Sequence, residues 1–311
     1  MIEIEGIQKS FHGTVALDGF SLRIEAGELY GLVGPNGAGK TTLIKILATL
    51  LQPDAGKARI SGFDPAVAPR SVRPLVGYFP DVAGLYQDMQ VGEFLEFFAD
   101  AFHLKGERRR LAVERALARA GLLERRDAYV EQLSMGMKQR LVLAKTLLHE
   151  PKVLLLDEPA TGLDPLARVA LRELLKQLNQ EGVTIFISSH ILSDLEDICT
   201  KVALIDSGHN ASDSDGRSVL TLGGTAQQLL ICDMEVSGTA ELAARVATGF
   251  GGARVISAEG TRLRVEVAGD TEQAMAFLQL LIAGGVRLIR FDTRGPSLEE
   301  RYRRAFGADQ R

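Results

Sequence analysis

The residues with the clearest chemistry lie in the segment GPNGAGKT, residues 34–41. Its glycines let the backbone curl so that successive amides point inward at phosphate groups. The Lys40 ammonium can reach the β- and γ-phosphates of a nucleoside triphosphate, and the Thr41 hydroxyl is placed to bind Mg²⁺. A structural glycine turn is the alternative, and the apolar run before the loop and the helical pattern after it argue against that alternative. The residues expected to bind the nucleotide here are Gly34, Asn36, Gly37, Ala38, Gly39, Lys40, Thr41 and Thr42.

A pair of acids, Asp157 and Glu158, follows the apolar run Val153 to Leu156. Ligands bind at the carboxyl ends of strands in open α/β sheets, so both carboxylates are expected beside the phosphate loop. Asp157 suits Mg²⁺ coordination through water. Glu158 is the candidate to orient or deprotonate an attacking water, and Lys40 joins it as a candidate catalytic residue. The alternative is a solvated acidic turn, which the pairing with the phosphate loop disfavours.

Alternating strands and helices are expected to hold these groups. Alternating polarity indicates half-buried strands near the start of the chain, and an all-apolar run indicates a buried strand before the phosphate loop. Strands that alternate with helices predict an α/β fold with a mainly parallel sheet. The predicted strands are Ile2–Ile4, Ser21–Ile24, Leu29–Val33, Val76–Pro80, Val153–Leu156 and Val183–Ile187. The predicted helices are Thr41–Leu51, Gly92–Phe102, Arg109–Ala120, Lys138–His149 and Leu166–Gln180.

After about residue 225 the pattern restarts, so we expect domains at 1–225 and 226–311. The order of the predicted elements in the second domain is β-α-β-β-α-β, which is that of a small α+β ferredoxin-like domain. A short charged helix is expected at its end, Ser297–Ala305. The other elements are Cys232–Val236, Ala240–Thr248, Ala253–Ser257, Leu263–Val267, Thr271–Ala283 and Arg287–Asp292.

The composition limits the classes of function. The net charge of −4 argues against nucleic acid as the main partner. Cys199 and Cys232 are too few for a disulfide framework or a four-cysteine zinc site, and buried free thiols are expected. No run reaches about 18 apolar residues, and residues 1–5 lack the pattern of a secretion signal. We therefore expect a globular protein with no transmembrane segment of its own, acting from the cytoplasmic side if it serves a membrane.

A third motif is more specific than the first two. The segment LSMGMKQR, residues 133–140, resembles the signature loop of ABC transporter ATP-binding subunits, and the resemblance covers about residues 1–225. It implies the P-loop NTPase fold of an ABC cassette, with antiparallel N-terminal strands and a helical subdomain at about 88–150. It also implies that Ser134, Gly136 and Met137 cap the γ-phosphate of an ATP held by a second copy of the chain or a homologous ATPase subunit.

Further matches to the family follow along the chain. Asp164, in the segment ATGLD, resembles the residue that contacts the opposite monomer. His190, after Ser188 and Ser189, resembles the histidine that touches the γ-phosphate and holds the attacking water, so it is a candidate catalytic residue. Phe11 occupies the place of the aromatic residue that stacks on adenine. An aromatic residue there could equally belong to the core.

One position departs from the family pattern. The family usually has glutamine at the end of the strand Val76–Pro80, where this chain has Asp81. A carboxylate is also a hard oxygen ligand, so Thr41, Asp81 and Asp157 are the candidate Mg²⁺ ligands. The extra negative charge beside the triphosphate predicts slower or differently coupled hydrolysis.

The resemblance implies an ATPase subunit, with ATP and Mg²⁺ as cofactors, that drives transport through a separate polytopic permease. Asp81, the LSxGM form of the signature and the C-terminal segment SLEE resemble the drug, antibiotic or polysaccharide export branch. The implied location is the cytoplasmic face of the inner membrane. The alternatives are a soluble ABC ATPase that is not coupled to transport and a nucleotide-dependent regulator without turnover. The cargo is not encoded here, because selectivity would lie in the permease.

Overall fold

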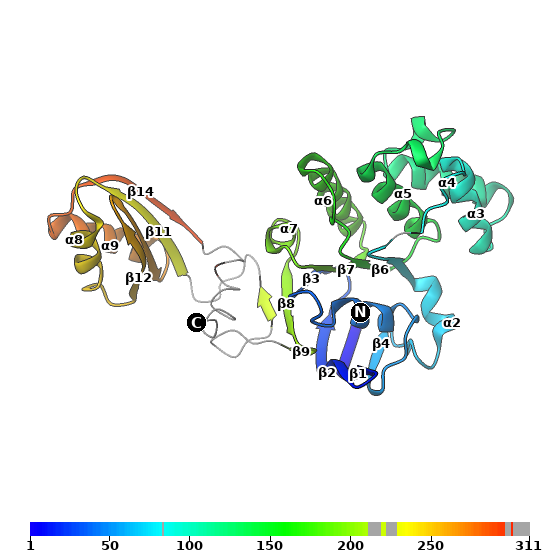
Figure 1. The fold of residues 1–311 in the computed structure, drawn as a ribbon, viewed down its shortest axis with the longest axis horizontal. Helices are drawn as coiled ribbons and strands as arrows, with labels where there is room; N and C mark the ends of the chain where they lie inside the picture. Colours follow the sequence, from blue (N-terminus) through cyan, green and yellow to red (C-terminus); the bar gives the residue numbers. More distant parts are fainter. Residues whose placement is uncertain (83, 211–218, 222–228, 296–299, 301–311) are drawn as a thin grey trace. The chain divides into compact units, whose positions relative to one another are not determined.

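The structure is a computed structural model of the 311-residue chain. It describes residues 1–82, 84–210, 219–221, 229–295 and 300. The chain divides into two compact units, Met1–Leu222 and Gly223–Arg311, and the sequence analysis placed this boundary near residue 225. Of the predicted helix Ser297–Ala305, only Glu300 lies within the described residues. Figure 1 labels the helices and strands.

The larger unit contains a mainly parallel sheet. Its strands are β3 (Leu29–Val33), β5 (Val76–Phe79), β6 (Val153–Asp157), β7 (Thr184–Ser189), β8 (Lys201–Asp206), β9 (His209–Asn210) and β10 (Val219–Thr221). The strand order is β10-β8-β3-β7-β6-β5, with β9 paired to β8. The pairs β8–β3, β3–β7, β7–β6 and β6–β5 are parallel, whereas β9 and β10 run antiparallel to β8. The predicted α/β class is confirmed.

A separate antiparallel sheet comes from the start of the chain. It consists of β1 (Ile2–Phe11), β2 (Thr14–Ile24) and β4 (Ala55–Ile60) in the order β2-β1-β4. Apolar side chains of this sheet, of α1 (Lys40–Leu47) and of the larger sheet form one buried cluster. The antiparallel N-terminal strands are therefore confirmed. Neither β4 nor β8 is among the predicted strands. In β4 the sequence shows a turn pattern because Gly56 approaches the Gly6 backbone too closely for a Cβ atom.

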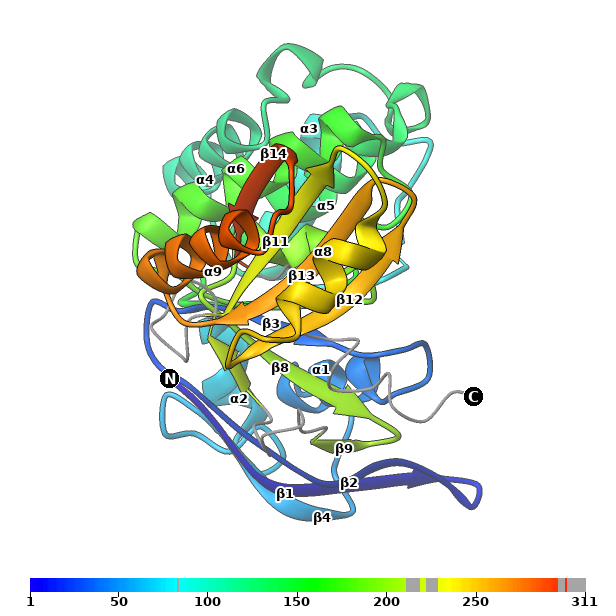
Figure 2. The same ribbon diagram turned by 90° about the vertical axis from the view of Figure 1, so that its left-hand side faces the viewer.

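Three helices form a group with its own apolar core. They are α3 (Val91–Ala101), α4 (Gly106–Arg119) and α5 (Met135–Leu147). Figures 1 and 2 both show this group on the far side of the larger sheet from β1, β2 and β4. The other helices of the unit are α2 (Pro69–Val72), α6 (Pro165–Gln180) and α7 (Leu192–Glu196), with short 3-10 helices at Arg73–Leu75, Leu123–Arg125 and Val130–Gln132.

Two helix boundaries differ from the prediction for local reasons. α1 ends at Leu47 rather than Leu51, because Thr49 adopts a left-handed conformation with φ of 63° and cannot continue the helix. α5 begins at Met135 rather than Lys138, because the Ser134 side chain accepts a hydrogen bond from the Met137 amide and caps the helix. The signature segment therefore forms the first turn of a helix and not a loop before it.

The smaller unit is an antiparallel sheet with two helices. Its elements are β11 (Leu229–Val236), α8 (Ala240–Ala247), β12 (Ala253–Glu259), β13 (Arg262–Ala268), α9 (Thr271–Ala283) and β14 (Leu288–Arg294). The strand order is β12-β13-β11-β14, and every neighbouring pair is antiparallel. α8 and α9 cover one face of the sheet (Figure 2), and the buried cluster between them includes Phe277 and Val265. The predicted order β-α-β-β-α-β is present.

Candidate functional site

The phosphate loop lies between the end of β3 and the start of α1. All five residues of β3 are buried, and α1 begins at Lys40 with Gly39 as its N-cap residue at φ of 104°. Glycine is required at two positions by close backbone contacts. A Cβ atom on Gly34 would lie 2.2 Å from the Ile205 carbonyl oxygen, and one on Gly39 would lie 2.3 Å from that of Ala16. These contacts hold the loop against β8 and β2.

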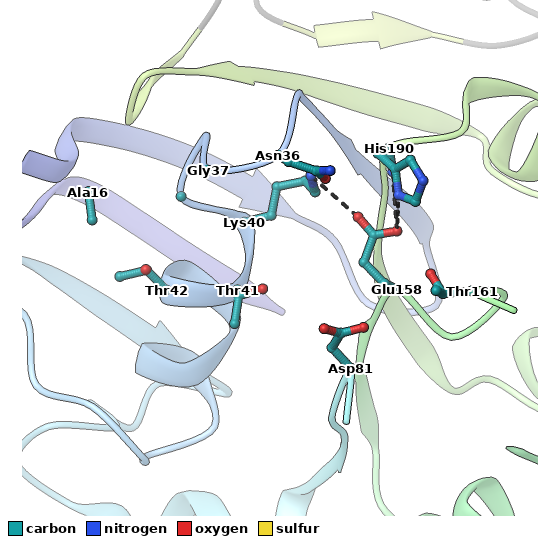
Figure 3. A pocket seen from close by; sticks show the side chains of 11 residues that line it. Ala16, Asn36, Gly37, Lys40, Thr41, Thr42, Asp81, Glu158, Thr161 and His190 are labelled. Carbon is teal, nitrogen blue, oxygen red and sulfur yellow. Dashed lines mark hydrogen bonds and ion pairs between the residues drawn. The ribbon is translucent and has the colours of Figure 1, made fainter. Parts of the chain in front are cut away.

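The ammonium group of Lys40 is nearly removed from water. Its side chain is 6% exposed, and Nζ donates hydrogen bonds to the carbonyl oxygens of Gly34 (2.8 Å) and Pro35 (3.1 Å). The same Nζ lies 3.3 Å from Oε1 of Glu158, as Figure 3 shows. A buried cation needs such partners, because transfer from water to a protein interior is costly for an unpaired charge. The lysine is therefore held inside the curl of its own loop.

The carboxylate of Glu158 lies between two partners. Oε1 faces Lys40, and Oε2 lies 2.6 Å from Nδ1 of His190 and accepts a hydrogen bond from the His190 amide at 3.3 Å (Figure 3). The backbone of Glu158 is left-handed, with φ of 49°. Non-glycine residues with positive φ are uncommon and concentrate at functional sites. An acid paired with a histidine in this way can orient a water molecule and accept a proton from it.

Asp157 is fully buried at the end of β6. Its Oδ1 accepts a hydrogen bond from the Ser188 hydroxyl at 2.8 Å, and the Glu158 amide donates to the same hydroxyl oxygen at 3.1 Å. Asp157 and Ser188 are direct partners in the parallel pairing of β6 and β7. Ser188 therefore fixes both acids through one side chain.

The surroundings of Asp157 suit a divalent cation. Its Oδ2 atom is buried and has no hydrogen-bond partner. Burial is the main cause that raises the pKa of Asp157, and the Ser188 hydrogen bond and the nearby Thr41 hydroxyl lower it. The charges of Asp81 and Glu158 raise the pKa again, so a cation here would relieve repulsion among three acids.

Protein ligands alone do not complete a cage for the cation. The described residues contain no group of three or more His, Cys, Asp or Glu side chains that could hold a metal ion. Mg²⁺ usually takes only one or two carboxylates from the protein and completes its shell with phosphate oxygens and water. The residues present therefore fit Mg²⁺ that arrives with a phosphate ligand.

A cavity of about 420 Å³ opens in front of these groups. Most of the predicted nucleotide, catalytic and metal residues line it, and Figure 3 shows their side chains converging from the phosphate loop and from the ends of β5, β6 and β7. Ala16 and Thr161 also line it and are not among the predicted residues. The predicted residues in the lining are Asn36, Gly37, Gly39, Lys40, Thr41, Thr42, Asp81, Glu158 and His190.

Some predicted residues lie outside the cavity lining. Ala38 is buried within the loop, and Gly34 lies against the Ile205 backbone. Phe11, at the end of β1, is 41% exposed, with the Lys9 ammonium 5.5 Å from its ring centroid. Lys9 in turn is paired with Asp54 at 2.6 Å. An exposed ring covered by a cation can offer a face for stacking, and adenine contact by Phe11 stays a prediction.

The signature residues form a second group on this unit. Ser134 caps α5, and Asp164 caps α6 by accepting the Ala167 amide at 2.9 Å. The two helix starts touch, since a Cβ atom on Gly136 would lie 3.0 Å from Cβ of Ala167. Met137, in the first turn of α5, donates its amide to Ser134. Two adjacent helix N-termini form a region of positive partial charge that attracts anions.

Ala16, Thr161 and Ser188 are not among the site residues that the sequence analysis assigns, although Thr161 and Ser188 lie in segments that it quotes. Ser188 acts through hydrogen bonds that depend on which strands are neighbours, and no spacing within the chain reveals that β6 lies beside β7. Thr161 follows the acid pair by a few residues, so its position after β6 is the signal that could have found it.

The sequence of the chain is similar to those of known proteins. The sequence profile of the ABC transporter family matches residues 17–161. The chain is 34% identical over 311 residues to a daunorubicin resistance ATP-binding protein, DrrA2, of Streptomyces coeruleorubidus, covering 98% of this chain and 95% of the relative. It is 39% identical over 212 residues to the Nod factor export ATP-binding protein I of Burkholderia lata, covering 68% of this chain and 70% of the relative.

Solved structures show the same architecture. An ATP-binding subunit of an ABC transporter is similar with a TM-score of 0.62 at 29% identity, covering 71% of this chain and 90% of that one. A dimeric bacterial ABC transporter cassette is similar with a TM-score of 0.64 at 25% identity, covering 72% of this chain and all of that one.

Replacing Ser188 with alanine tests the linkage of the two acids. The Ser188→Ala variant leaves Oδ1 of buried Asp157 and the Glu158 amide without their partner, so the free energy of unfolding is expected to fall by about 1–3 kcal/mol. Urea denaturation followed by circular dichroism measures the change. Ser71→Ala, at an exposed position of α2, serves as the control and should change little. Equal stabilities of Ser188→Ala and the wild type would show that the hydroxyl does not hold the acids.

Proposed function

Because this chain belongs to the ATP-binding ATPases of ABC transporters, we propose that it powers export of a substrate through a separate membrane permease. The observation that best supports ATP hydrolysis by this chain is the position of the Glu158 carboxylate, which is held between Lys40 and His190 in the cavity. Two relatives of the chain are named for drug resistance and for export, which supports the direction of transport.

The phosphate loop would bind the β- and γ-phosphates of ATP. The amides of the loop and the N-terminus of α1 supply partial positive charge, and Lys40 supplies a full charge. The bound triphosphate would compete with Glu158 for the Lys40 ammonium. Since that contact is an ion pair at 3.3 Å, exchange of one anion for another costs less than exposure of an unpaired cation. Glu158 would then be free to face the γ-phosphate.

Glu158 and His190 would together position the attacking water. His190 is held to Glu158 through both its ring and its amide, so the two side chains move as a pair. The carboxylate accepts a proton from the water as the bond to the γ-phosphate forms. The imidazole then lies beside the γ-phosphate, where it can donate a hydrogen bond.

Thr41, Asp81 and Asp157 are the proposed residues for Mg²⁺. The unpartnered Oδ2 of Asp157 and the Thr41 hydroxyl beside it support this assignment. When bound, Mg²⁺ supplies positive charge that balances the phosphate oxygens during transfer. Asp81 adds a negative charge to that site, where the family usually has a neutral residue.

A second ATP-binding subunit would complete each site. Ser134 and Asp164 lie outside the cavity of their own chain, at two adjacent helix N-termini that suit a phosphate from a partner. The surface around them is apolar, with Met135 58%, Leu166 82% and Val169 53% exposed. Exposed apolar groups of this kind mark interaction sites. Two chains arranged head to tail would enclose two ATP molecules.

The permease would contact a surface formed by Tyr86, in the segment that follows Asp81, and Phe97 on α3. Both side chains are about half exposed, and their rings meet edge to face at 5.8 Å. Aromatic residues are enriched at the centres of protein interfaces. Within the described part of the chain, no helix has the length and apolar character needed to span a bilayer. We propose that the protein lies on the cytoplasmic face of the membrane, held there by the permease.

Replacing Glu158 with glutamine tests the catalytic assignment. The amide cannot accept the proton, so ATP hydrolysis is expected to fall about a hundredfold or more, while ATP still binds and holds two chains together. Phosphate release and light scattering with ATP measure the two effects. Glu173→Gln, at an exposed position of α6, is the matched control. A Glu158→Gln variant that hydrolyses ATP at the control rate would contradict the assignment.

Asp81 is tested by restoring the residue usual in the family. The Asp81→Gln variant removes a negative charge beside the triphosphate, so the hydrolysis rate is expected to rise about two- to tenfold and its Mg²⁺ dependence to change. Steady-state rates over a Mg²⁺ titration measure both. Asp88→Asn, in the same exposed segment, controls for loss of charge alone. An unchanged rate together with an unchanged Mg²⁺ dependence would contradict the role of Asp81.

Association with a permease is tested in cells. The tagged chain is expected to co-purify from membranes with a polytopic protein, and the amount should fall at least about threefold in a Tyr86→Ala, Phe97→Ala variant that removes two anchors of the interface. Mass spectrometry identifies the partner, and a Leu123→Ala variant, exposed elsewhere on the same helical group, is the control. Recovery from the soluble fraction alone, with no membrane protein, would favour an ABC ATPase that is not coupled to transport.

A further inference from the structure

An ion cluster of two arginines on α6 and two acids, Asp194 and Asp197, joins α6 to the segment of α7. Asp194 on α7 is 5% exposed, and its Oδ1 accepts a hydrogen bond from Nη2 of Arg172 at 3.1 Å. Nη1 of Arg168 lies 3.7 Å from the same oxygen. Both arginines project from α6. A buried carboxylate is stable only with such partners, so the cluster fixes how α7 lies against α6.

Arg168 has a second contact that reaches the start of its own helix. Its Nε donates a hydrogen bond to the Leu163 carbonyl oxygen at 3.2 Å. Leu163 precedes Asp164, the N-cap residue of α6. One guanidinium group therefore joins the loop that ends at Asp164 to the carboxylate of Asp194. The planar fork of arginine can serve two acceptors in fixed directions, which a lysine ammonium does not do in the same way.

Asp194 is linked in turn to His190 through a short turn. The Asp194 amide donates to the Ile191 carbonyl oxygen at 3.2 Å. The Ser189 hydroxyl donates to the same oxygen at 3.1 Å and accepts the Ile191 amide at 3.0 Å. These bonds enclose the backbone of His190, so the position of α7 determines where its imidazole lies.

The cluster packs directly against the segments that carry the catalytic pair. A space of only about 10 Å³ separates them, too small for a ligand. The two arginines and Asp194 line this space together with residues that follow Glu158 and precede His190. These residues are Pro159, Ala160, Ser188 and Ser189.

We propose that Arg168 is a positioning residue for ATP hydrolysis. Through Leu163 and Asp194 it holds the loop before α6 and the turn of His190 in one geometry, and this geometry keeps the imidazole 2.6 Å from Glu158. In the two-chain arrangement, on which this part rests, the same loop meets the partner subunit. Arg168 then makes the position of His190 depend on the docking of that subunit.

The Arg168→Lys variant distinguishes a role of Arg168 in positioning His190 from a role in the stability of the fold. Lysine keeps the positive charge opposite Asp194 but gives up the second contact, so kcat for ATP hydrolysis is expected to fall about tenfold while KM for ATP stays within about twofold. The melting temperature should stay near that of the wild type. Arg119→Gln, which removes a surface ion pair with Glu181, is the matched control and should leave kcat unchanged.

A double-mutant cycle links the effect to Asp194. The Asp194→Asn variant is expected to lower kcat to a similar extent, and the Arg168→Lys, Asp194→Asn double variant should be no slower than either single variant. Additive losses, or a wild-type kcat in Arg168→Lys, would overturn the proposal. Hydrolysis by the wild type without cooperativity between sites would instead refute the two-chain part of the proposed function, and the kcat comparison would still decide the role of Arg168.

Discussion

Lys40 and Glu158 carry opposite charges in a place from which the fold excludes most water, with 6% and 12% of their side chains exposed. Neither charge would be tolerated there alone, because the loss of hydration costs several kcal/mol for each ion. Their contact at 3.3 Å, the loop carbonyl groups around Lys40 and the His190 ring against Glu158 offset that cost. A triphosphate that enters the cavity would take the place of Glu158 beside the Lys40 ammonium, so the lysine keeps an anionic partner and the Glu158 carboxylate keeps its contact with His190.

The strand order makes this contact possible. β7 lies between β3 and β6 in the parallel sheet, so the residues at its end fall between the phosphate loop and the acid pair. Ser188 therefore reaches Asp157 and the Glu158 amide, and His190 reaches the Glu158 carboxylate. Parallel strands place all their carboxyl ends on one edge, where a ligand can meet side chains from several segments distant in sequence. The left-handed backbone of Glu158 then turns its side chain back toward Lys40.

The sequence was sufficient where chemistry requires a fixed spacing. The phosphate loop, the acid pair and the signature segment could each be predicted because the backbone turn or helix start that they form is local. Residues that act across strands could not, and Ser188 is the clearest example, since its role depends on the neighbour relation between β6 and β7. Helix ends were missed for a similar reason. α5 begins at Met135, three residues before the predicted start, because the hydrogen bond that Ser134 accepts as N-cap residue outweighs the low helix propensity of Gly136.

The arrangement of the first turns of α5 and α6 indicates why a single chain would not complete an ATP site. α5 and α6 begin side by side, with Gly136 against Ala167, so their partial positive charges lie close together away from their own cavity. The closeness of the two partial positive charges is unfavourable as long as no anion lies in front of both helix starts. The apolar side chains around them, of which Leu166 is the most exposed, also stay in contact with water as long as no partner covers them. A phosphate presented by a second subunit would relieve both costs at once, so ATP binding and subunit association would each favour the other.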